Sequence, residues 1–140
     1  MQDLTLFIQH HLTLTLLFAV LVVLIFIIEM LRLKNKAGQL SSSQLTMMIN
    51  HQQAQVIDLR PSEQFTKGHI IDALSLPLTE FKEKSKKLEK MKNHPLILVC
   101  AKGFDSPKIA ASLQTQGFQV HILRGGIQTW LQDNLPLVKD

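Results

Sequence analysis

Cys100 is the only cysteine among the 140 residues, and its surroundings are those of a reactive thiol. It ends a short apolar run at 95–100, and a loop containing Gly103 follows, with Ser106 and Pro107 next. Loop amides and a helix N-terminus stabilise negative charge, so a strand, loop and helix in this order can present a nucleophilic thiolate. A cysteine that ends a strand can also serve as a small apolar residue, so a reactive thiol and a structural residue are both open interpretations of Cys100.

An uncharged segment lies near the N-terminus. Residues 4–28 carry no charge, and 12–28 are apolar except for two threonines. About 20 residues of helix cross a bilayer core about 30 Å thick, so the stretch 7–31 is long enough to span. A buried core helix would need a larger domain around it, and a signal peptide would need a basic start and a cleavage site with small residues. The sequence therefore predicts a transmembrane anchor with a basic flank over residues 1–36.

The charges beside this anchor predict its orientation. Arg32, Lys34 and Lys36 follow the span, and no lysine or arginine precedes it. By the positive-inside rule, this asymmetry places the C-terminal part in the cytoplasm and the N-terminus outside. A reducing compartment also suits one unpaired cysteine. We therefore expect a single-pass protein of the inner (cytoplasmic) membrane, with the lipid bilayer as one partner.

The overall charge excludes some partners. The net charge is +4, and the chain has no basic stripe interleaved with aromatic residues, which argues against nucleic acid. The densest charged run, residues 82–92, mixes both signs; it predicts the solvated face of a helix, with a contact to lipid headgroups as the alternative. The six histidines and the one cysteine show no metal-ligand spacing, so no metal site is expected.

The segment 37–140 alternates short apolar runs with helical patterns and forms one expected domain. Residues 37–39 indicate a linker. Strands are predicted at 56–59, 73–77, 96–100 and 120–123. Helices are predicted at 42–50 (capped by Ser42 or Ser43), at 62–66, over the charged run (capped by Thr79), from Ser106 as N-cap to Gly117, and after Gly126. This alternation is typical of an α/β domain with a mostly parallel sheet.

Several polar residues follow the predicted strands. In parallel sheets the functional site lies beyond the carboxyl ends of the strands, where Cys100, residues 58–60 and the loop after Leu123 all fall. We expect Asp58 and Arg60 to form a scaffold of hydrogen bonds to neighbouring loops rather than to react.

The order of these motifs resembles the rhodanese-like domain, the single-domain sulfurtransferase family. The resembling pieces are VIDLR at 56–60, EQF at 63–65, KGHI at 67–70, Ala73, LP at 76–77, LILVC at 96–100, GF at 117–118, LRGG at 123–126 and Trp130. A transmembrane segment ahead of such a domain resembles the membrane-bound rhodanese-like proteins of bacterial inner membranes. The resemblance implies a three-layer domain around the parallel sheet.

The resemblance also implies a mechanism without metal or organic cofactor. In the family, the loop cysteine takes the outer sulfur of thiosulfate or another sulfane donor, holds it as a persulfide and passes it to a thiophilic acceptor such as cyanide or a protein thiol. Cys100 would be this nucleophile. The substrate-binding loop would comprise Ala101, Lys102, Gly103, Phe104, Asp105 and Ser106. Its amides would cradle the persulfide, and Lys102 would attract an anionic donor.

Asp105 departs from the family pattern, because active loops of the family often carry a basic residue there. Its carboxylate offsets Lys102 and opposes both a thiolate and an incoming thiosulfate. Phosphatase relatives of this fold need arginine six residues after the cysteine, where this chain has Ser106, so phosphate-ester hydrolysis is disfavoured. Three functions stay open: a sulfurtransferase, a catalytically weak module for protein–protein interaction at the membrane, and a redox-sensing thiol.

Overall fold

The computed structural model describes residues 11–34 and 37–139, within two compact units, Met1–Lys36 and Ala37–Asp140. In the first unit, helix α2 (Leu12–Lys34) contains a 19-residue stretch, Leu12–Met30, none of which is buried. By length and composition this stretch can cross a membrane. Residues 7–10 of the predicted span lie outside the described residues.

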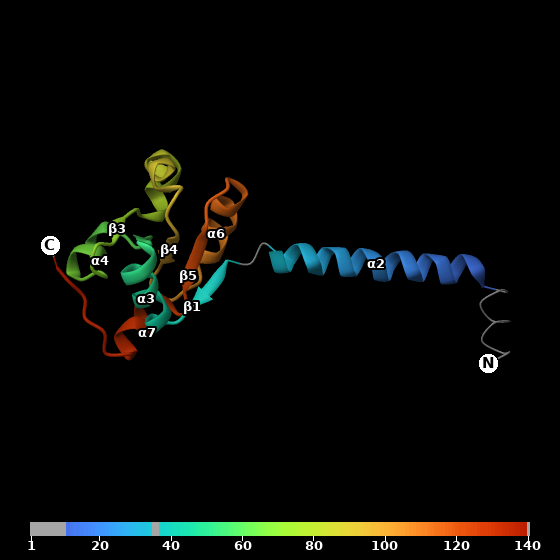
Figure 1. Ribbon diagram of the computed structural model, residues 1–140, viewed down its shortest axis with the longest axis horizontal. Helices are drawn as coiled ribbons and strands as arrows, with labels where there is room; N and C mark the ends of the chain where they lie inside the picture. The colour runs from blue at the N-terminus through green and yellow to red at the C-terminus, as the bar shows by residue number, and fades with distance from the viewer. Residues whose placement is uncertain (1–10, 35–36, 140) are drawn as a thin grey trace. The chain divides into compact units, whose positions relative to one another are not determined.

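The second unit is built on a five-stranded sheet in which every strand pair is parallel (Figure 1). Its order is β1 (Gly38–Leu40), β5 (Val120–Leu123), β4 (Leu96–Val99), β2 (Gln55–Asp58) and β3 (Leu74–Ser75). The predicted α/β class with a parallel sheet is confirmed. Strands β4 and β2 lie next to each other in the interior of the sheet, so the residues that follow them meet at one edge.

Strand β1 was not expected. Residues 37–39 were predicted to be a linker, but Gly38, Gln39 and Leu40 pair with His121, Ile122 and Leu123 of β5. This edge strand contains one apolar residue and no β-branched residue, so it carries none of the pattern that marks a strand. Pairing with β5 supplies its stability, since the amide of Arg124 also donates to the Leu40 carbonyl at 2.9 Å.

Alternation along the strands divides the core into two layers, one on each face of the sheet. The α6-side core comprises Ile57, Leu59, Leu76, Phe81, Leu88, Leu96, Leu98, Cys100, Ala110, Leu113, Phe118, Val120 and Ile122. The α3-side core comprises Leu45, Met48, Ala54, Val56, Ile70, Ile97, Val99, Leu123, Ile127 and Trp130. Helices therefore cover both faces, as the three-layer expectation required.

Helices α3 (Ser42–Gln52) and α7 (Gly126–Gln132) cover the α3-side core, and α4 (Ser62–Lys67) lies between β2 and β3 in the chain. The predicted cap of α3, Ser42 or Ser43, was wrong. Ser41 is the N-cap, with its hydroxyl accepting from the Gln44 amide and the Gln44 side chain accepting from the Ser41 amide. Ser42 instead turns inward and donates to Asp133 Oδ2 at 2.6 Å.

The charged run does not form the single helix that was predicted. It is divided into η1 (Leu78–Glu80), α5 (Phe81–Lys84) and η2 (Ser85–Met91), two of which are 3₁₀ segments. Thr79 lies inside η1, and no side chain caps these segments. Lys86 stands four residues from both Lys82 and Lys90, a spacing at which like charges destabilise an α-helix.

His121 on β5 is partly buried, and its ring has no hydrogen-bond partner among the described residues. Both ring nitrogens are shielded from solvent without a hydrogen bond from the part of the chain that the structure describes, and a Cβ added at Gly38 of β1 would lie 3.0 Å from Nδ1. Desolvation by burial lowers the pKa of His121 below its ordinary value of 6.5. The folded domain therefore favours the neutral imidazole.

We expect the free energy of unfolding to decrease as the pH falls below 6.5. In that range the unfolded chain binds a proton that the folded chain does not, until the lower folded-state pKa is reached. The replacement His121→Phe removes this contribution. Urea unfolding of both proteins at about pH 7.5 and about pH 5.5 checks the prediction. An equal loss in both proteins on acidification would assign the effect to other groups.

Candidate active site

Cys100 directly follows β4 and is 2 % exposed. It continues the alternation of Leu96 and Leu98, so its side chain lies in the α6-side core. Its Sγ accepts a hydrogen bond from the Gly103 amide at 3.0 Å. Gly103 has φ of 87°, a left-handed conformation that turns the amide back toward the sulfur. A backbone donor at this distance stabilises negative charge on sulfur.

The N-terminus of α7 fixes the start of the loop. The amides of Ile127 and Gln128 donate to the carbonyls of Cys100 and Ala101 at 3.0 Å and 3.2 Å. Gly126 must be glycine here, because a Cβ would lie 2.1 Å from the Cys100 carbonyl oxygen, and its φ is 62°. The backbone of the loop is therefore held by a second, distant segment of the chain.

The side chains of the loop differ sharply in exposure. Ala101, Lys102 and Asp105 are exposed, and Phe104 is 82 % exposed, whereas Ser106 is 0 % exposed. Water screens the charges of Lys102 and Asp105, so each acts on an approaching anion more weakly than a buried charge would.

Ser106 was predicted to be the N-cap of α6 (Ser106–Thr115), and this prediction was wrong. Asp105 is the N-cap, its side chain makes no capping hydrogen bond, and Ser106 is the first helical residue. The Ser106 hydroxyl is buried and unpaired among the described residues. Because its side chain is turned into the protein, it cannot reach the free amides of the first turn.

Asp58 and Arg60 form a buried ion pair at the neighbouring strand end. Arg60 Nη2 lies 2.7 Å from Asp58 Oδ2 and also donates to the Gly68 carbonyl at 2.7 Å. The side chains of Arg60 and Asp58 are 8 % and 1 % exposed. Asp58 follows Ile57, which faces the α6-side core, so alternation directs the carboxylate to the face opposite Cys100. The geometry is that of a scaffold joining β2 to the segment after α4.

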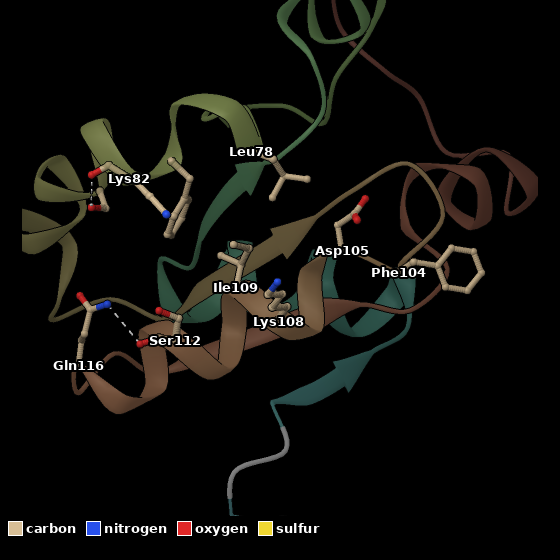
Figure 2. Close-up of a pocket in the computed structure, with 10 residues that line it drawn as sticks. Leu78, Lys82, Phe104, Asp105, Lys108, Ile109, Ser112 and Gln116 are labelled. Atoms are coloured by element: carbon tan, nitrogen blue, oxygen red, sulfur yellow. Dashed lines mark hydrogen bonds between the residues drawn. The ribbon is translucent and has the colours of Figure 1, made fainter.

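A groove borders the outer side of the loop, between α6 and the segment that includes η1 and α5 (Figure 2). Its volume is about 610 Å³. The lining residues are Leu78, Phe81, Lys82, Ser85, Phe104, Asp105, Lys108, Ile109, Ser112 and Gln116. Figure 2 shows the Phe104 ring pointing away from the other labelled side chains. The lining combines apolar side chains with the cations of Lys82 and Lys108 and the carboxylate of Asp105.

The sequence placed the loop after Leu123 at the functional edge of the sheet, but the hydrogen bonds from α7 that hold the start of the Cys100 loop were not predicted. The signal for it was the glycine pair Gly125 and Gly126 directly after β5, at the same sheet edge as Cys100. Such a pair marks a turn with left-handed backbone and a close approach of two chain segments.

Comparison with known proteins now identifies the domain. Residues 41–133 match the family described as Rhodanese-like domain. The chain belongs to the rhodanese-like family. YibN of Escherichia coli K12, described as an uncharacterized protein, is 33 % identical over 141 residues that cover 99 % of each chain. The thiosulfate sulfurtransferase GlpE of Coxiella burnetii is 31 % identical over 93 residues, or 66 % of this chain and 85 % of GlpE.

Solved structures agree on the rhodanese-like fold. A rhodanese-related protein from Thermoplasma volcanium aligns with a TM-score of 0.64 and 26 % identity, covering 74 % of this chain and 99 % of that protein. A rhodanese-like domain protein from Staphylococcus aureus aligns with a TM-score of 0.64 and 22 % identity, covering 74 % of this chain and 98 % of the other. Each alignment therefore covers nearly the whole of the other protein and about three quarters of this chain.

Proposed function

We propose that this rhodanese-like protein is a membrane-anchored sulfurtransferase that carries sulfane sulfur on Cys100. The observation that carries the proposal is the position of Cys100 at the end of β4, with the Gly103 amide donating to its Sγ at 3.0 Å. Likeness to the thiosulfate sulfurtransferase GlpE supports thiosulfate as a donor class. Because Cys100 is 2 % exposed, a donor must present a small terminal sulfur.

The reaction proceeds in two half-steps. The Cys100 thiolate attacks the outer sulfur of thiosulfate, a new S–S bond forms, and the bond to the sulfonate sulfur breaks so that sulfite leaves with the electron pair. The total charge is unchanged, and the product is an anionic cysteine persulfide. A thiolate of a small molecule or protein, or cyanide, then attacks the outer sulfur, and Cys100 leaves as a thiolate.

Helix α2 would hold this reaction at a membrane. Its apolar Leu12–Met30 stretch supports a single span, and the basic residues at 32, 34 and 36 support a cytoplasmic domain by the positive-inside rule. A cysteine introduced at the exposed residue Met47, in a Cys100→Ser background, gives an accessible thiol, and its labelling by a membrane-impermeant thiol reagent in intact cells and in opened cells tests the orientation. Labelling by a membrane-impermeant thiol reagent in intact cells would place the domain outside.

Intact-mass spectrometry of the full-length protein in detergent micelles tests the chemistry. After incubation with thiosulfate or polysulfide we expect a gain of one sulfur atom that cyanide removes as thiocyanate. No adduct from either donor, with the protein shown to be folded, would reject the sulfurtransferase proposal.

The exposed carboxylate of Asp105 is expected to reduce activity with an anionic donor. The replacement Asp105→Arg should raise kcat/KM for thiosulfate severalfold, and more so at low salt, because it reverses a charge beside the loop. The change removes no capping hydrogen bond, since the Asp105 side chain makes none. Steady-state thiocyanate formation at two ionic strengths measures the effect.

Glu63→Arg makes the same change in net charge on α4 and serves as the control. Equal stimulation by Glu63→Arg and Asp105→Arg would assign the gain to the overall charge of the protein. Unchanged activity of Asp105→Arg would show that the charge of this residue does not affect the reaction with thiosulfate.

A second candidate is a catalytically weak module for protein–protein interaction at the membrane. Phe104, at 82 % exposure beside the 610 Å³ groove, is the observation that favours it. The mass experiment separates the two candidates, since a binding module needs no persulfide.

A further inference from the structure

A buried hydroxyl at the start of α6 has no partner in the described part of the chain. Ser106 is 0 % exposed, and its Oγ makes no hydrogen bond to another described residue. Buried polar groups are nearly always paired, because an unpaired one loses its hydration without compensation. The resting fold therefore does not explain why this position carries a hydroxyl.

The helix itself shows where the hydroxyl lies. Ser106, Ala110 and Leu113 stand at positions i, i+4 and i+7, which share one face of an α-helix. All three are 0 % exposed, and Ala110 and Leu113 belong to the α6-side core. The inward face of α6 thus begins at Ser106, at the end of the helix that follows the Cys100 loop.

Cys100 belongs to the same layer. Its side chain is in the α6-side core together with Ala110 and Leu113, at the carboxyl end of β4. Ser106 Oγ and Cys100 Sγ therefore lie in one layer, at the same edge of the sheet, without a hydrogen bond between them. The sulfur already accepts the Gly103 amide.

We propose that the Ser106 hydroxyl donates a hydrogen bond to the outer sulfur of the Cys100 persulfide. This inference rests on the proposed sulfurtransferase function and assigns one further residue to it. Loading extends the side chain of Cys100 by an S–S bond of about 2.05 Å and moves the negative charge to the new terminal sulfur. That charge arrives in the layer where the unpaired hydroxyl lies.

The start of α6 is suited to this anion in two further ways. The helix has ten residues, and its dipole presents partial positive charge at the end that carries Ser106. No side chain caps its first turn, so the amide donors there are not consumed by Asp105. A hydrogen bond to a charged acceptor is stronger than one between neutral groups, so the hydroxyl contributes more to the persulfide than to the thiol.

The replacement Ser106→Ala tests the proposal in the full-length protein in detergent micelles. Loading by thiosulfate, followed by intact mass, should slow by about tenfold to a hundredfold, the loss expected for one hydrogen bond to a charged group. The thermal midpoint of the resting thiol form should stay the same or rise, since a methyl group replaces an unpaired hydroxyl. The rise in midpoint on loading should be smaller than in the parent protein.

Ser62→Ala is the matched control, because Ser62 is the first residue of α4, as Ser106 is of α6, but is exposed. It should load at the parent rate. Loading of Ser106→Ala at the parent rate would overturn the proposal, and so would a lowered midpoint of its resting form, which would show that the hydroxyl has a structural partner.

Failure of the proposed function gives a different result. In that case the parent protein itself takes up no sulfur, and the role of Ser106 is rejected along with the function. If the parent loads and Ser106→Ala loads equally well, the sulfurtransferase stands and only the role of Ser106 is lost.

Discussion

Replacing Cys100 with serine is expected to abolish sulfur transfer, with a loss of at least about a thousandfold in thiocyanate formation from thiosulfate and cyanide. A hydroxyl at this position is a much weaker nucleophile than a thiolate and cannot hold sulfane sulfur as a persulfide. No other residue can take its place, because Cys100 is the only cysteine in the sequence.

The fold should survive this replacement. Serine is close in size to cysteine, and its Oγ can accept the Gly103 amide that Sγ accepts in the parent. Near-ultraviolet circular dichroism and the thermal midpoint check that Cys100→Ser is folded, and intact mass shows whether sulfur is bound. Thiocyanate formation within tenfold of the parent rate, in the folded variant, would show that Cys100 does not carry the sulfur.

Removing Arg60 is expected to cause the largest loss of stability. The replacement Arg60→Met leaves the Asp58 carboxylate, 1 % exposed, without its cation, and leaves the Gly68 carbonyl without a donor. Breaking one side of a buried ion pair typically costs about 3–5 kcal/mol. Guanidinium unfolding of Arg60→Met and of the parent measures the difference in the free energy of unfolding.

A double replacement distinguishes an uncompensated charge from lost packing. Asp58→Asn combined with Arg60→Met removes both charges, so it should be less destabilised than Arg60→Met alone. Arg60→Lys keeps the charge but not the planar group that reaches both Asp58 oxygens, and its free energy of unfolding should fall between those of the parent and Arg60→Met. A loss below about 1 kcal/mol in Arg60→Met would show that the pair contributes only what a surface pair does.

The parts of the fold that follow from hydrophobic pattern were predicted from the sequence. Strand β4 is a continuous apolar run and β2 and β5 are mostly apolar, and the glycines and prolines around them mark the connections, so the existence of these strands could be predicted. Strand β1 was not, because Gly38 and Gln39 are strand residues only through their pairing with β5. Pairing between segments more than 80 positions apart leaves no local pattern.

The helix N-caps were a second source of error. At the N-termini of α3 and α6, a serine was predicted to be the cap because of its residue type alone. Ser42 and Ser106 have side chains that suit an N-cap, yet both are buried and turned inward. Their inward direction is set by the face of the helix that packs on the sheet, which the sequence around one residue does not specify. The spacing from Ser41 to Gln44, by contrast, is the capping-box pattern and could have identified that cap.

The place of β1 in the sheet has a practical consequence for any shortened form of the protein. A version that begins at Gln39 loses Gly38 from the strand and weakens the cover over β5. The part of β5 at His121, which pairs with Gly38, would then offer unpaired backbone groups to a second molecule. Such edges promote aggregation. A version that keeps all of β1 must include Gly38, and poor solubility of a shorter one would reflect strand loss rather than loss of the membrane helix.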